Sequence, residues 1–492
     1  MTPNKLYDFI IIGAGVIGCA IARELTRYQG EVLVIEKEDD VASGISKANS
    51  GVLHAGFNVP PGTLKAKTNV LGHSRFQGLA RELDFSMRTT EKLVVAMDDD
   101  ERKHLEFLYH QGLKNGVGGL SLIDREEIEN LEPNIRGEYA LRSANAGIIE
   151  PYELVISLAE NAHANGAEFV FLEEVFSIDK QGPIFRVATS VGRAYSTRWV
   201  INCAGIHSDQ ISRLVAATEH TIHPCRGEYY ITDKVEGMID RMIYPPPPAH
   251  GAGLGIHFTP TIEHNILLGP SAEYIEGRND TATTAPVMAS IKAQISRYIP
   301  KLADLAFIRN YAGIRPKLIS KSGEEKFADF VIEENDQVSR FIDLIGIESP
   351  GLTAAPAIAE MVVAIIGKKE DLIPSKAFNP YRERAVRFAL LPPEEQAAAI
   401  AEDEQAGIMA CRCETVPQSE VIAAIENRLG VSSLDAIKRR TRAMMGRCQG
   451  GFCTPRIVDL LIDRYGKQPD EIYKNNEGSN LFYGLIKDDR SV

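Results

Sequence analysis

A glycine motif near the N-terminus restricts the fold more than any other feature of this sequence. An apolar run over residues 8–12 is followed by Gly13, Gly15 and Gly18, and then by an amphipathic stretch that ends near residue 28. This order predicts a strand, a tight turn and a helix. Gly13 permits the bend, Gly15 lets backbone amides approach a pyrophosphate, and Gly18 allows close packing of helix on strand. The free amides of the helix N-terminus would then face the phosphates.

An acidic residue completes this pattern. A second apolar run, residues 32–35, ends in Glu36, which lies eighteen residues after Gly18. A carboxylate at this place accepts hydrogen bonds from the ribose hydroxyls of a dinucleotide. A plain βαβ unit is the alternative, but it leaves Glu36 at the strand end unexplained. The sequence therefore predicts dinucleotide binding.

Length and composition limit the class of protein. With 492 residues, the chain is long enough for two or three domains. Its 44% hydrophobic and 25% charged residues exclude a largely disordered chain. The net charge of −13 argues against nucleic acid as a partner. No apolar run is long enough to span a bilayer, and the first residues lack a signal-peptide pattern. We therefore expect a cytoplasmic protein that has no transmembrane segment. Such a protein would associate with a membrane only through a partner.

The seven cysteines fall into two groups. Cys19, Cys203 and Cys225 are scattered and are expected to be core thiols. The other four lie close together near the C-terminus, which suggests a second kind of chemistry in the same chain.

Five ordered motifs give the chain a family resemblance. A segment rich in small and hydroxyl residues follows Glu36, and three further motifs occur later in the chain. The chain resembles the D-amino-acid-oxidase-like FAD flavoproteins, which include glycerol-3-phosphate dehydrogenases and L-2-hydroxyglutarate dehydrogenases. The resemblance covers roughly residues 5 to 370 and is carried by the glycine motif with Glu36, residues 49–56, 201–205, 226–230, and 313–316 with 346–353.

The resemblance implies FAD as the cofactor. It also implies that residues 349–351 lead into an apolar helix, residues 352–366, whose free amides face the flavin. The residues that the resemblance assigns to FAD binding are Gly13, Gly15, Gly18, Glu36, Ser43, Asn49, Ser50, Gly51, Ala204, Gly205, Gly351, Leu352 and Thr353.

Oxidation of an alcohol or amine by a flavin also needs a cation that anchors an acidic substrate. By resemblance Arg315 takes this role, because a guanidinium suits both carboxylate and phosphate. Arg226 and Lys317 are weaker candidates.

The reaction further needs a base for the proton on the heteroatom. We favour His257, with His54 and Tyr229 as alternatives. A histidine in a strand is otherwise more often a packed, hydrogen-bonded residue. Some relatives attach flavin through a histidine near the position of His54, but the residues after His54 depart from theirs, so we expect no covalent bond.

The C-terminal cysteines predict a metal centre. Cys411 and Cys413 are separated from Cys448 and Cys453 by thirty-four residues of helical pattern. Four thiolates on loops between helices in a cytosolic chain favour a metal over disulfides. Zinc is the competing interpretation. The C-x-C spacing, with Gly446, Gly450 and Gly451 nearby, favours an iron–sulfur centre. Ser432 is expected to cap the helix that follows it, and Thr454 is expected to cap the last helix of the chain.

A second resemblance supports this interpretation. Residues 411–465 resemble the bacterioferritin-associated-ferredoxin-like domain, and residues 439–442 and 445–453 match its form in anaerobic glycerol-3-phosphate dehydrogenase large subunits. It implies a [2Fe–2S] cluster ligated by Cys411, Cys413, Cys448 and Cys453. The same segment contains a basic set, which comprises Lys438, Arg439, Arg440, Arg442, Arg447 and Arg456. We expect these cations mainly to stabilise the negatively charged cluster. Docking of an acidic redox partner is the alternative role.

Together these features predict an α/β FAD-binding Rossmann-like domain, an α+β antiparallel-sheet substrate domain and a small helical [2Fe–2S]-binding domain. Residues 255–260 and 265–269 are expected to form a hairpin, and residues 245–248 a loop. The expected boundaries are 1–90, 146–225 and 326–370 for the FAD domain, 91–145 and 226–325 for the substrate domain, 371–405 for a linker, 406–466 for the cluster domain and 467–492 for a tail.

The expected activity is that of an FAD-dependent dehydrogenase for a small anionic secondary alcohol. The C-terminal resemblance favours sn-glycerol 3-phosphate, oxidised to dihydroxyacetone phosphate. Residues 61–65 and 226–230 look closer to the 2-hydroxyglutarate dehydrogenases, so a 2-hydroxy acid stays open. An amine or amino acid is a third alternative, with the C-terminal domain as a docking module. A cluster beside a flavin argues for export of electrons to a partner subunit or carrier.

Overall fold

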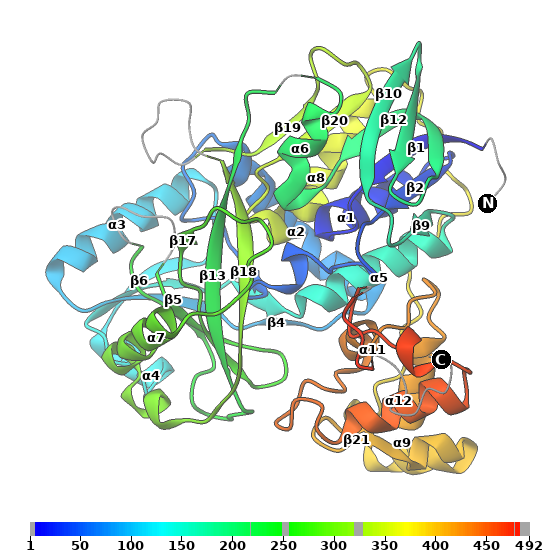
Figure 1. Ribbon diagram of the computed structural model, residues 1–492. Coiled ribbons are helices and arrows are strands. Elements are labelled where there is room, and N and C mark those ends of the chain that lie inside the picture. The colour runs from blue at the N-terminus through cyan, green and yellow to red at the C-terminus, as the bar shows by residue number, and fades with distance from the viewer. Residues whose placement is uncertain (1–4, 217, 248–254, 319–327, 477, 483–492) are drawn as a thin grey trace. The chain divides into compact units, whose positions relative to one another are not determined.

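The computed structural model describes residues 5–216, 218–247, 255–318, 328–476 and 478–482 (Figure 1). The chain divides into two compact units. The larger comprises Met1–Ile35 with Ala42–Arg382, and the smaller comprises Glu36–Val41 with Glu383–Val492.

An eight-stranded sheet forms the first layer of the larger unit. Its strand order is β10-β11-β12-β1-β2-β9, with β20 on β12 and β19 on β20. Strands β20, β12, β1, β2 and β9 run parallel, and the others are antiparallel. The parallel strands are nearly continuous apolar runs because both of their faces are buried. The strands are β1 (Leu6–Ile12), β2 (Val32–Ile35), β9 (Glu168–Val170), β10 (Val175–Gln181), β11 (Ile184–Thr189), β12 (Ala194–Asn202), β19 (Val331–Glu334) and β20 (Phe341–Ile345).

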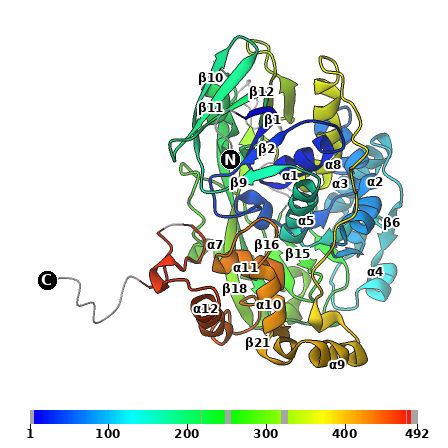
Figure 2. The same ribbon diagram turned by 90° about the vertical axis from the view of Figure 1, so that its right-hand side faces the viewer.

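Helices of this unit pack on one another beside the sheet. Helix α1 contacts α5 and α8, and α8 contacts α2 (Figure 2). Helices α2 and α8 approach closely at Gly72, where a Cβ would lie 2.1 Å from the carbonyl oxygen of Thr353. The helices are α1 (Val16–Leu25), α2 (Leu64–Leu83), α5 (Pro151–Ala164), α6 (Ser208–Arg213) and α8 (Gly351–Ile366).

A nine-stranded sheet forms the second layer. Its order is β17-β13-β16-β15-β14-β5-β7-β6, with β18 on β13, and only the pair β14–β5 is parallel among the described strands. The strands are β5 (Lys92–Ala96), β6 (Leu120–Asp124), β7 (Tyr139–Ser143), β13 (Ile222–Thr232), β14 (Met242–Tyr244), β15 (His257–Pro260), β16 (Ile266–Gly269), β17 (Glu273–Tyr274) and β18 (Phe307–Leu318).

The predicted hairpin is confirmed, since β15 pairs with β16. Residues 245–247 follow β14 outside any strand, as expected, and residue 248 lies outside the described residues. A small sheet joins β3 (Val52–Leu53), β8 (Gly147–Ile149) and β4 (Met87–Thr89). The other helices of the larger unit are α3 (Asp99–Lys114), α4 (Arg125–Leu131), α7 (Ala285–Tyr298) and the short 3₁₀ turns Ile45–Lys47, Gly205–His207 and Pro300–Asp304.

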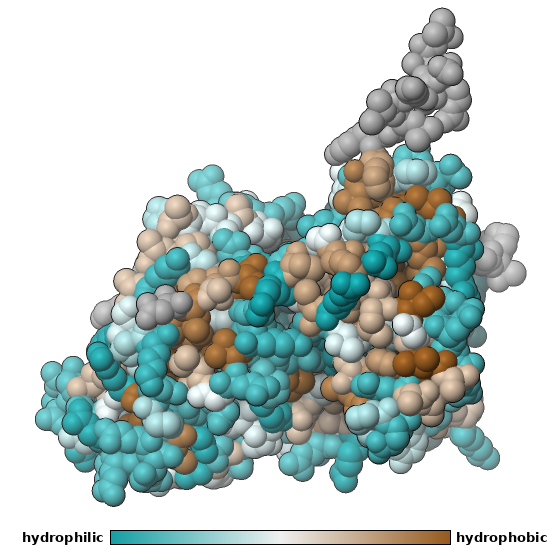
Figure 3. Space-filling view, turned by 90° about the horizontal axis from the view of Figure 1, so that it is seen from below, coloured by the Kyte–Doolittle hydropathy of each residue, from teal (hydrophilic) through white to brown (hydrophobic). Residues whose placement is uncertain are grey.

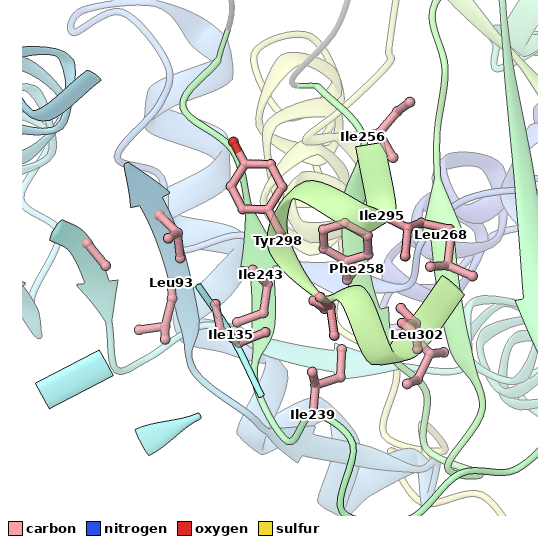
Figure 4. Close-up of a cluster of buried hydrophobic side chains, with 14 of the residues drawn as sticks. Leu93, Ile135, Ile239, Ile243, Ile256, Phe258, Leu268, Ile295, Tyr298 and Leu302 are labelled. Atoms are coloured by element: carbon pink, nitrogen blue, oxygen red, sulfur yellow. The ribbon is translucent and has the colours of Figure 1, made fainter. Parts of the chain in front are cut away.

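The two faces of the nine-stranded sheet bury different sets of side chains. One face carries an apolar core that includes Leu93, Ile243 and Phe258 and continues into α7 through Ile295 (Figure 4). Because neighbouring residues of a strand point to opposite faces, Lys92, Tyr244 and His257 belong to the other face. This second face carries an apolar cluster of its own, which includes Val94, Leu141 and Met242, and Tyr244 of that cluster stacks on His257.

The smaller unit is helical around its own core, which includes Val421, Ile437 and Ile457. Two capping predictions were one residue or more out of place. Ser433, not Ser432, caps α11 by accepting from the amide of Ala436, and Phe452, not Thr454, precedes α12. The elements are α9 (Pro393–Glu402), α10 (Gln418–Ile425), α11 (Leu434–Thr441), α12 (Cys453–Asp463), β21 (Met409–Cys411), β22 (Val416–Pro417) and the 3₁₀ turns Phe388–Leu390, Glu404–Gly407 and Pro469–Glu471.

Within the described part of the chain, no helix combines the length and apolar character that crossing a membrane requires. On the face drawn in Figure 3, brown hydrophobic residues are interspersed among teal hydrophilic ones. Such a mixture is ordinary for a protein surface.

Candidate active site and cofactor sites

The glycine turn between β1 and α1 is tightly built. Gly13 has a φ of +104°, and its amide donates to the carbonyl oxygen of Ile35 at 2.8 Å. A Cβ at Gly13 would lie 2.5 Å from the carbonyl oxygen of Cys203, and one at Gly18 would lie 1.9 Å from that of Gly13. Both positions therefore require glycine. The turn and the first amides of α1 can approach a pyrophosphate, as the sequence predicts.

The segment after the second strand folds back onto this helix. The amide of Val16 donates to Ser46 Oγ at 2.9 Å, and Asn49 Nδ2 donates to the carbonyl oxygen of Ser46 at 2.8 Å. Asn49 Oδ1 in turn accepts from the amide of Gly51 at 2.8 Å. Ser43 lies in the turn before Ser46. Sequence reasoning missed Ser46, although it belongs to the hydroxyl-rich segment that was noted.

The other predicted cofactor residues follow strands or begin helices. Ala204 and Gly205 follow β12, whose carboxyl end lies beside that of β1, and Glu36 follows β2 directly in the chain. The carboxyl edge of a parallel sheet is the usual place for a dinucleotide. Gly351, Leu352 and Thr353 form the first turn of α8, and Thr353 Oγ1 accepts from the amide of His54 at 3.0 Å. The segments of the larger unit thus lie at the strand ends and helix starts where a nucleotide is usually bound, and their assignment to FAD stays a prediction.

The predicted catalytic residues His257, Tyr229 and Arg315 lie on the face of the nine-stranded sheet opposite Phe258. Ser50 Oγ lies 3.1 Å from Tyr229 Oη and 3.2 Å from His257 Nε2. Tyr229 stacks on Tyr311 with ring centroids 4.7 Å apart, and burial raises the pKa of both phenols. Ser50, predicted to bind the cofactor, therefore also links two candidate catalytic side chains.

The contacts of His257 define its protonation state and its tautomer. Burial and the charge of Lys92 lower the pKa of His257 to about 3, so the imidazole is neutral at physiological pH. Its Nδ1 lies 3.1 Å from the carbonyl oxygen of Gly255, an atom that can only accept, so Nδ1 carries the proton. The lone pair therefore lies on Nε2, the nitrogen that faces Ser50.

His54 is the second candidate base. Its Nε2 lies 3.4 Å from Ser349 Oγ, and burial with the charge of Lys92 lowers the pKa of His54 well below its ordinary value. His54 is therefore also neutral.

The three candidate anchors have different partners. Arg226 lies on the opposite face of β13 from Tyr229 and pairs with Glu273 at 2.8 Å and Asp280 at 2.7 Å. Lys317 pairs with Glu348 at 3.1 Å. Arg315 contacts Cys225 Sγ and the carbonyl oxygen of Ser271, and no carboxylate pairs with it among the residues described. Arg315 alone of the three is therefore available to bind an anion.

The scattered cysteines are buried, as predicted. Burial raises the pKa of the Cys203 thiol, which makes it unreactive.

The four C-terminal cysteines form two pairs, Cys411 with Cys453 and Cys413 with Cys448. Among the described residues, no group of three or more His, Cys, Asp or Glu side chains is arranged so that it could hold a metal ion. Hydrogen bonds from the Cys453 thiol and from the amides of Glu414, Met444 and Cys413 lower the pKa of Cys411 to about 6. Amides directed at thiolates favour an iron–sulfur centre, and two pairs suit two irons with two thiolates each.

A close approach beside these cysteines also fits a cluster. A Cβ at Gly446 would lie 2.3 Å from Cys413 Cβ, so this turn requires glycine. Cys411 and Cys453 are buried, whereas Cys413 and Cys448 are exposed. The residues present therefore fit a [2Fe–2S] cluster with one side near the surface of its domain.

Part of the basic set forms ion pairs. Arg442 pairs with Glu414 at 3.0 Å, and Asp40 pairs with Arg439 at 3.1 Å and with Arg440 at 2.7 Å. These three arginines are matched to carboxylates, and the role of the basic set in stabilising the cluster stays a prediction.

Comparisons with known proteins agree with both sites. Residues 8–365 match the family described as FAD dependent oxidoreductase, and residues 409–463 match the BFD-like [2Fe-2S] binding domain. The fold and these sites thus define a flavin- and iron–sulfur-dependent oxidoreductase. The chain belongs to the FAD dependent oxidoreductase family and carries a C-terminal BFD-like [2Fe–2S] domain, which argues against zinc.

Three relatives are informative. A glycerol 3-phosphate dehydrogenase of Caloramator mitchellensis is 40% identical over 485 residues, 98% of this chain and 99% of that protein. A mitochondrial L-2-hydroxyglutarate dehydrogenase of Arabidopsis thaliana is 30% identical over 401 residues, 72% of this chain and 82% of that protein. The FAD-bound L-alpha-glycerophosphate oxidase structure from Mycoplasma pneumoniae is 28% identical, has a TM-score of 0.72, and covers 78% of this chain and 100% of that one.

Proposed function

We propose that the protein oxidises sn-glycerol 3-phosphate to dihydroxyacetone phosphate. The similarity to a glycerol 3-phosphate dehydrogenase over 98% of the chain, cluster domain included, carries this proposal. The unpaired Arg315 and the neutral His257 on one sheet face support it, since the reaction needs a cation for the phosphate and a base for the hydroxyl.

Each residue has one task in this proposal. Arg315 binds the phosphate and orients the secondary alcohol. His257 Nε2 takes the proton of the C2 hydroxyl, and Ser50, which Tyr229 contacts in turn, holds the imidazole in place. Thr353 ties the first turn of α8 to the chain at His54. When bound, FAD accepts the hydride from C2, and the [2Fe–2S] cluster carries electrons singly.

The cluster domain is proposed to export the electrons to a partner subunit or carrier. The exposure of Cys413 and Cys448 supports this role, because a cluster near the surface is accessible to an acceptor. By the same proposal Cys411, Cys413, Cys448 and Cys453 are the ligands.

A 2-hydroxy acid is the second candidate substrate, because the Arabidopsis relative is an L-2-hydroxyglutarate dehydrogenase. The sequence similarity at residues 61–65 adds little to this candidate. Lys65 is buried and pairs with Glu348 at 2.9 Å, so it has a structural role.

Anaerobic flavin bleaching tests the substrate. Glycerol 3-phosphate, L-2-hydroxyglutarate and amino acids are added separately to the oxidised holoenzyme, and the loss of flavin absorbance is followed. The proposal expects fastest bleaching by glycerol 3-phosphate. Faster bleaching by L-2-hydroxyglutarate or by an amino acid would contradict it.

The Arg315→Ala enzyme tests the anchor. Removing a cation that pairs with a desolvated anion costs about 3 kcal/mol, so we expect KM for glycerol 3-phosphate to rise about 100-fold. Arg309→Ala, in the same strand but exposed, is the matched control and should leave KM within about twofold. Steady-state kinetics of both variants measure KM. An unchanged KM in the Arg315→Ala enzyme would show that Arg315 does not bind the substrate.

A further inference from the structure

Lys92 is a buried cation that the proposed reaction does not use. It lies on β5, its exposed fraction is 2%, and its ammonium makes no hydrogen bond or ion pair with any residue that the structure describes. Burying an ammonium without an acceptor is costly unless a ligand supplies one or the group gives up its proton. The aromatic rings beside Lys92 stabilise its charge, but the residues described accept no hydrogen bond from its ammonium, so its donors are left for a ligand.

Its surroundings place Lys92 beside the candidate bases. The ammonium lies 3.6 Å from the centroid of the Tyr244 ring and 5.0 Å from that of Phe57. The His257 ring stacks on Tyr244 at 3.9 Å with an angle of 9°. Two groups this close cannot share one face of the ring, so Tyr244 is sandwiched between Lys92 and His257. The charge of Lys92 also reaches His54, whose pKa it lowers.

The strand order sets Lys92 apart from Arg315. Strand β15, with His257, lies between β5 and β18 in the order β18-β13-β16-β15-β14-β5. Five strand spacings separate the backbones of Lys92 and Arg315, on the order of 24 Å along the sheet. Because the two cations lie on opposite sides of the base, they are too far apart to bind the same oxyanion. They are better placed to bind the two ends of one small molecule.

We propose that Lys92 binds the end of the substrate remote from Arg315, where it donates to a hydroxyl or to an oxyanion. This inference rests on the proposed function, since it concerns the same substrate. In glycerol 3-phosphate the group at this end is the C1 hydroxyl. A substrate with a carboxylate there would be bound more tightly, because a charged acceptor forms a stronger hydrogen bond with an ammonium.

Binding of non-reacting anions tests this role without turnover. Glutarate carries a carboxylate at each end, whereas sulfate offers a single oxyanion, and both are titrated into the oxidised holoenzyme while the flavin absorbance is followed. Lys92→Met should weaken glutarate binding at least about tenfold and leave sulfate within about twofold. Arg315→Ala should weaken both anions. In Lys92→Met we also expect about a tenfold higher KM for glycerol 3-phosphate.

Lys292 provides the matched control. It lies 5.4 Å from the Tyr230 ring and 5.3 Å from the Phe307 ring, and both rings pack on the opposite, apolar face of the same sheet. Lys292→Met should bind glutarate as the wild type does. If flavin content shows that Lys92→Met does not fold, Lys92→Gln takes its place. The same loss of glutarate binding is expected for Lys92→Gln.

The pH dependence of glutarate binding gives a second readout. Burial lowers the pKa of Lys92 to about 7, so its charge is lost as the pH rises through 7. Of the groups facing it, Tyr244 on β14 has a raised pKa, while His257 on β15 and His54 after β3 have lowered ones, so none of the three changes its charge as the pH rises through 7. Glutarate affinity should fall by up to about tenfold for each pH unit above 7 in wild type, and stay level in Lys92→Met.

Two results would overturn the assignment. One is equal glutarate affinity in Lys92→Met and wild type, and the other is a wild-type enzyme that does not bind glutarate. Failure of glycerol 3-phosphate to bleach the flavin overturns only the proposed function, because the glutarate comparison requires no reaction.

Discussion

The Cys448→Ser enzyme is expected to reduce its flavin with glycerol 3-phosphate at a rate within about twofold of wild type, while transfer to an external one-electron acceptor falls about 100-fold or more. Serine removes one thiolate from the four that we propose as ligands. Cys448 is exposed, so the change should leave the domain core intact. Stopped-flow absorbance measures flavin reduction, and reduction of ferricenium measures onward transfer.

Arg428→Ser serves as the control, because Arg428 belongs to the same unit and its side chain is 53% exposed. It should retain both rates. Unimpaired onward transfer in Cys448→Ser, combined with loss of an associated subunit, would instead support a docking role for the cluster domain.

The His257→Asn enzyme is expected to reduce its flavin about 1,000-fold more slowly than wild type, with a smaller change in KM. Asparagine can still donate to the carbonyl oxygen of Gly255, but it offers no basic nitrogen toward Ser50. Stopped-flow reduction at saturating substrate measures the effect. His54→Asn is the matched comparison and should slow reduction less than about tenfold.

The opposite order of effects would assign the base to His54. The wild-type pH profile adds a check on the same residue. Because His257 is neutral down to about pH 3, its protonation should produce no loss of flavin reduction between pH 7 and pH 5.

Local patterns allowed much of the site to be predicted from the sequence. The glycine turn follows from sterics within a few residues, and the structure shows why Gly13 and Gly18 cannot carry a Cβ. The hairpin at His257 is equally local. The alternation of β13 also contained a signal that sequence reasoning did not use. Arg226 and Tyr229 are three residues apart in a strand, so they point to opposite faces and do not share one site.

Long-range pairing accounts for what was missed. Lys92 and Tyr244 meet because β5 pairs with β14, and about 150 residues separate these strands in the chain. Nothing in the local pattern of either strand indicates this neighbour. Likewise, residues 36–41 group with the C-terminal unit, in which Asp40 pairs with Arg439 and Arg440. Nothing local in the sequence indicates that these two members of the basic set pair with Asp40.

Anaerobic addition of glycerol 3-phosphate to the oxidised holoenzyme, followed by visible absorbance and low-temperature EPR, tests the central claim most directly. We expect the flavin to bleach and the signal of a reduced [2Fe–2S] cluster to appear in the same sample. A flavin that stays oxidised, or a cluster that stays silent while the flavin is fully reduced, would contradict the account.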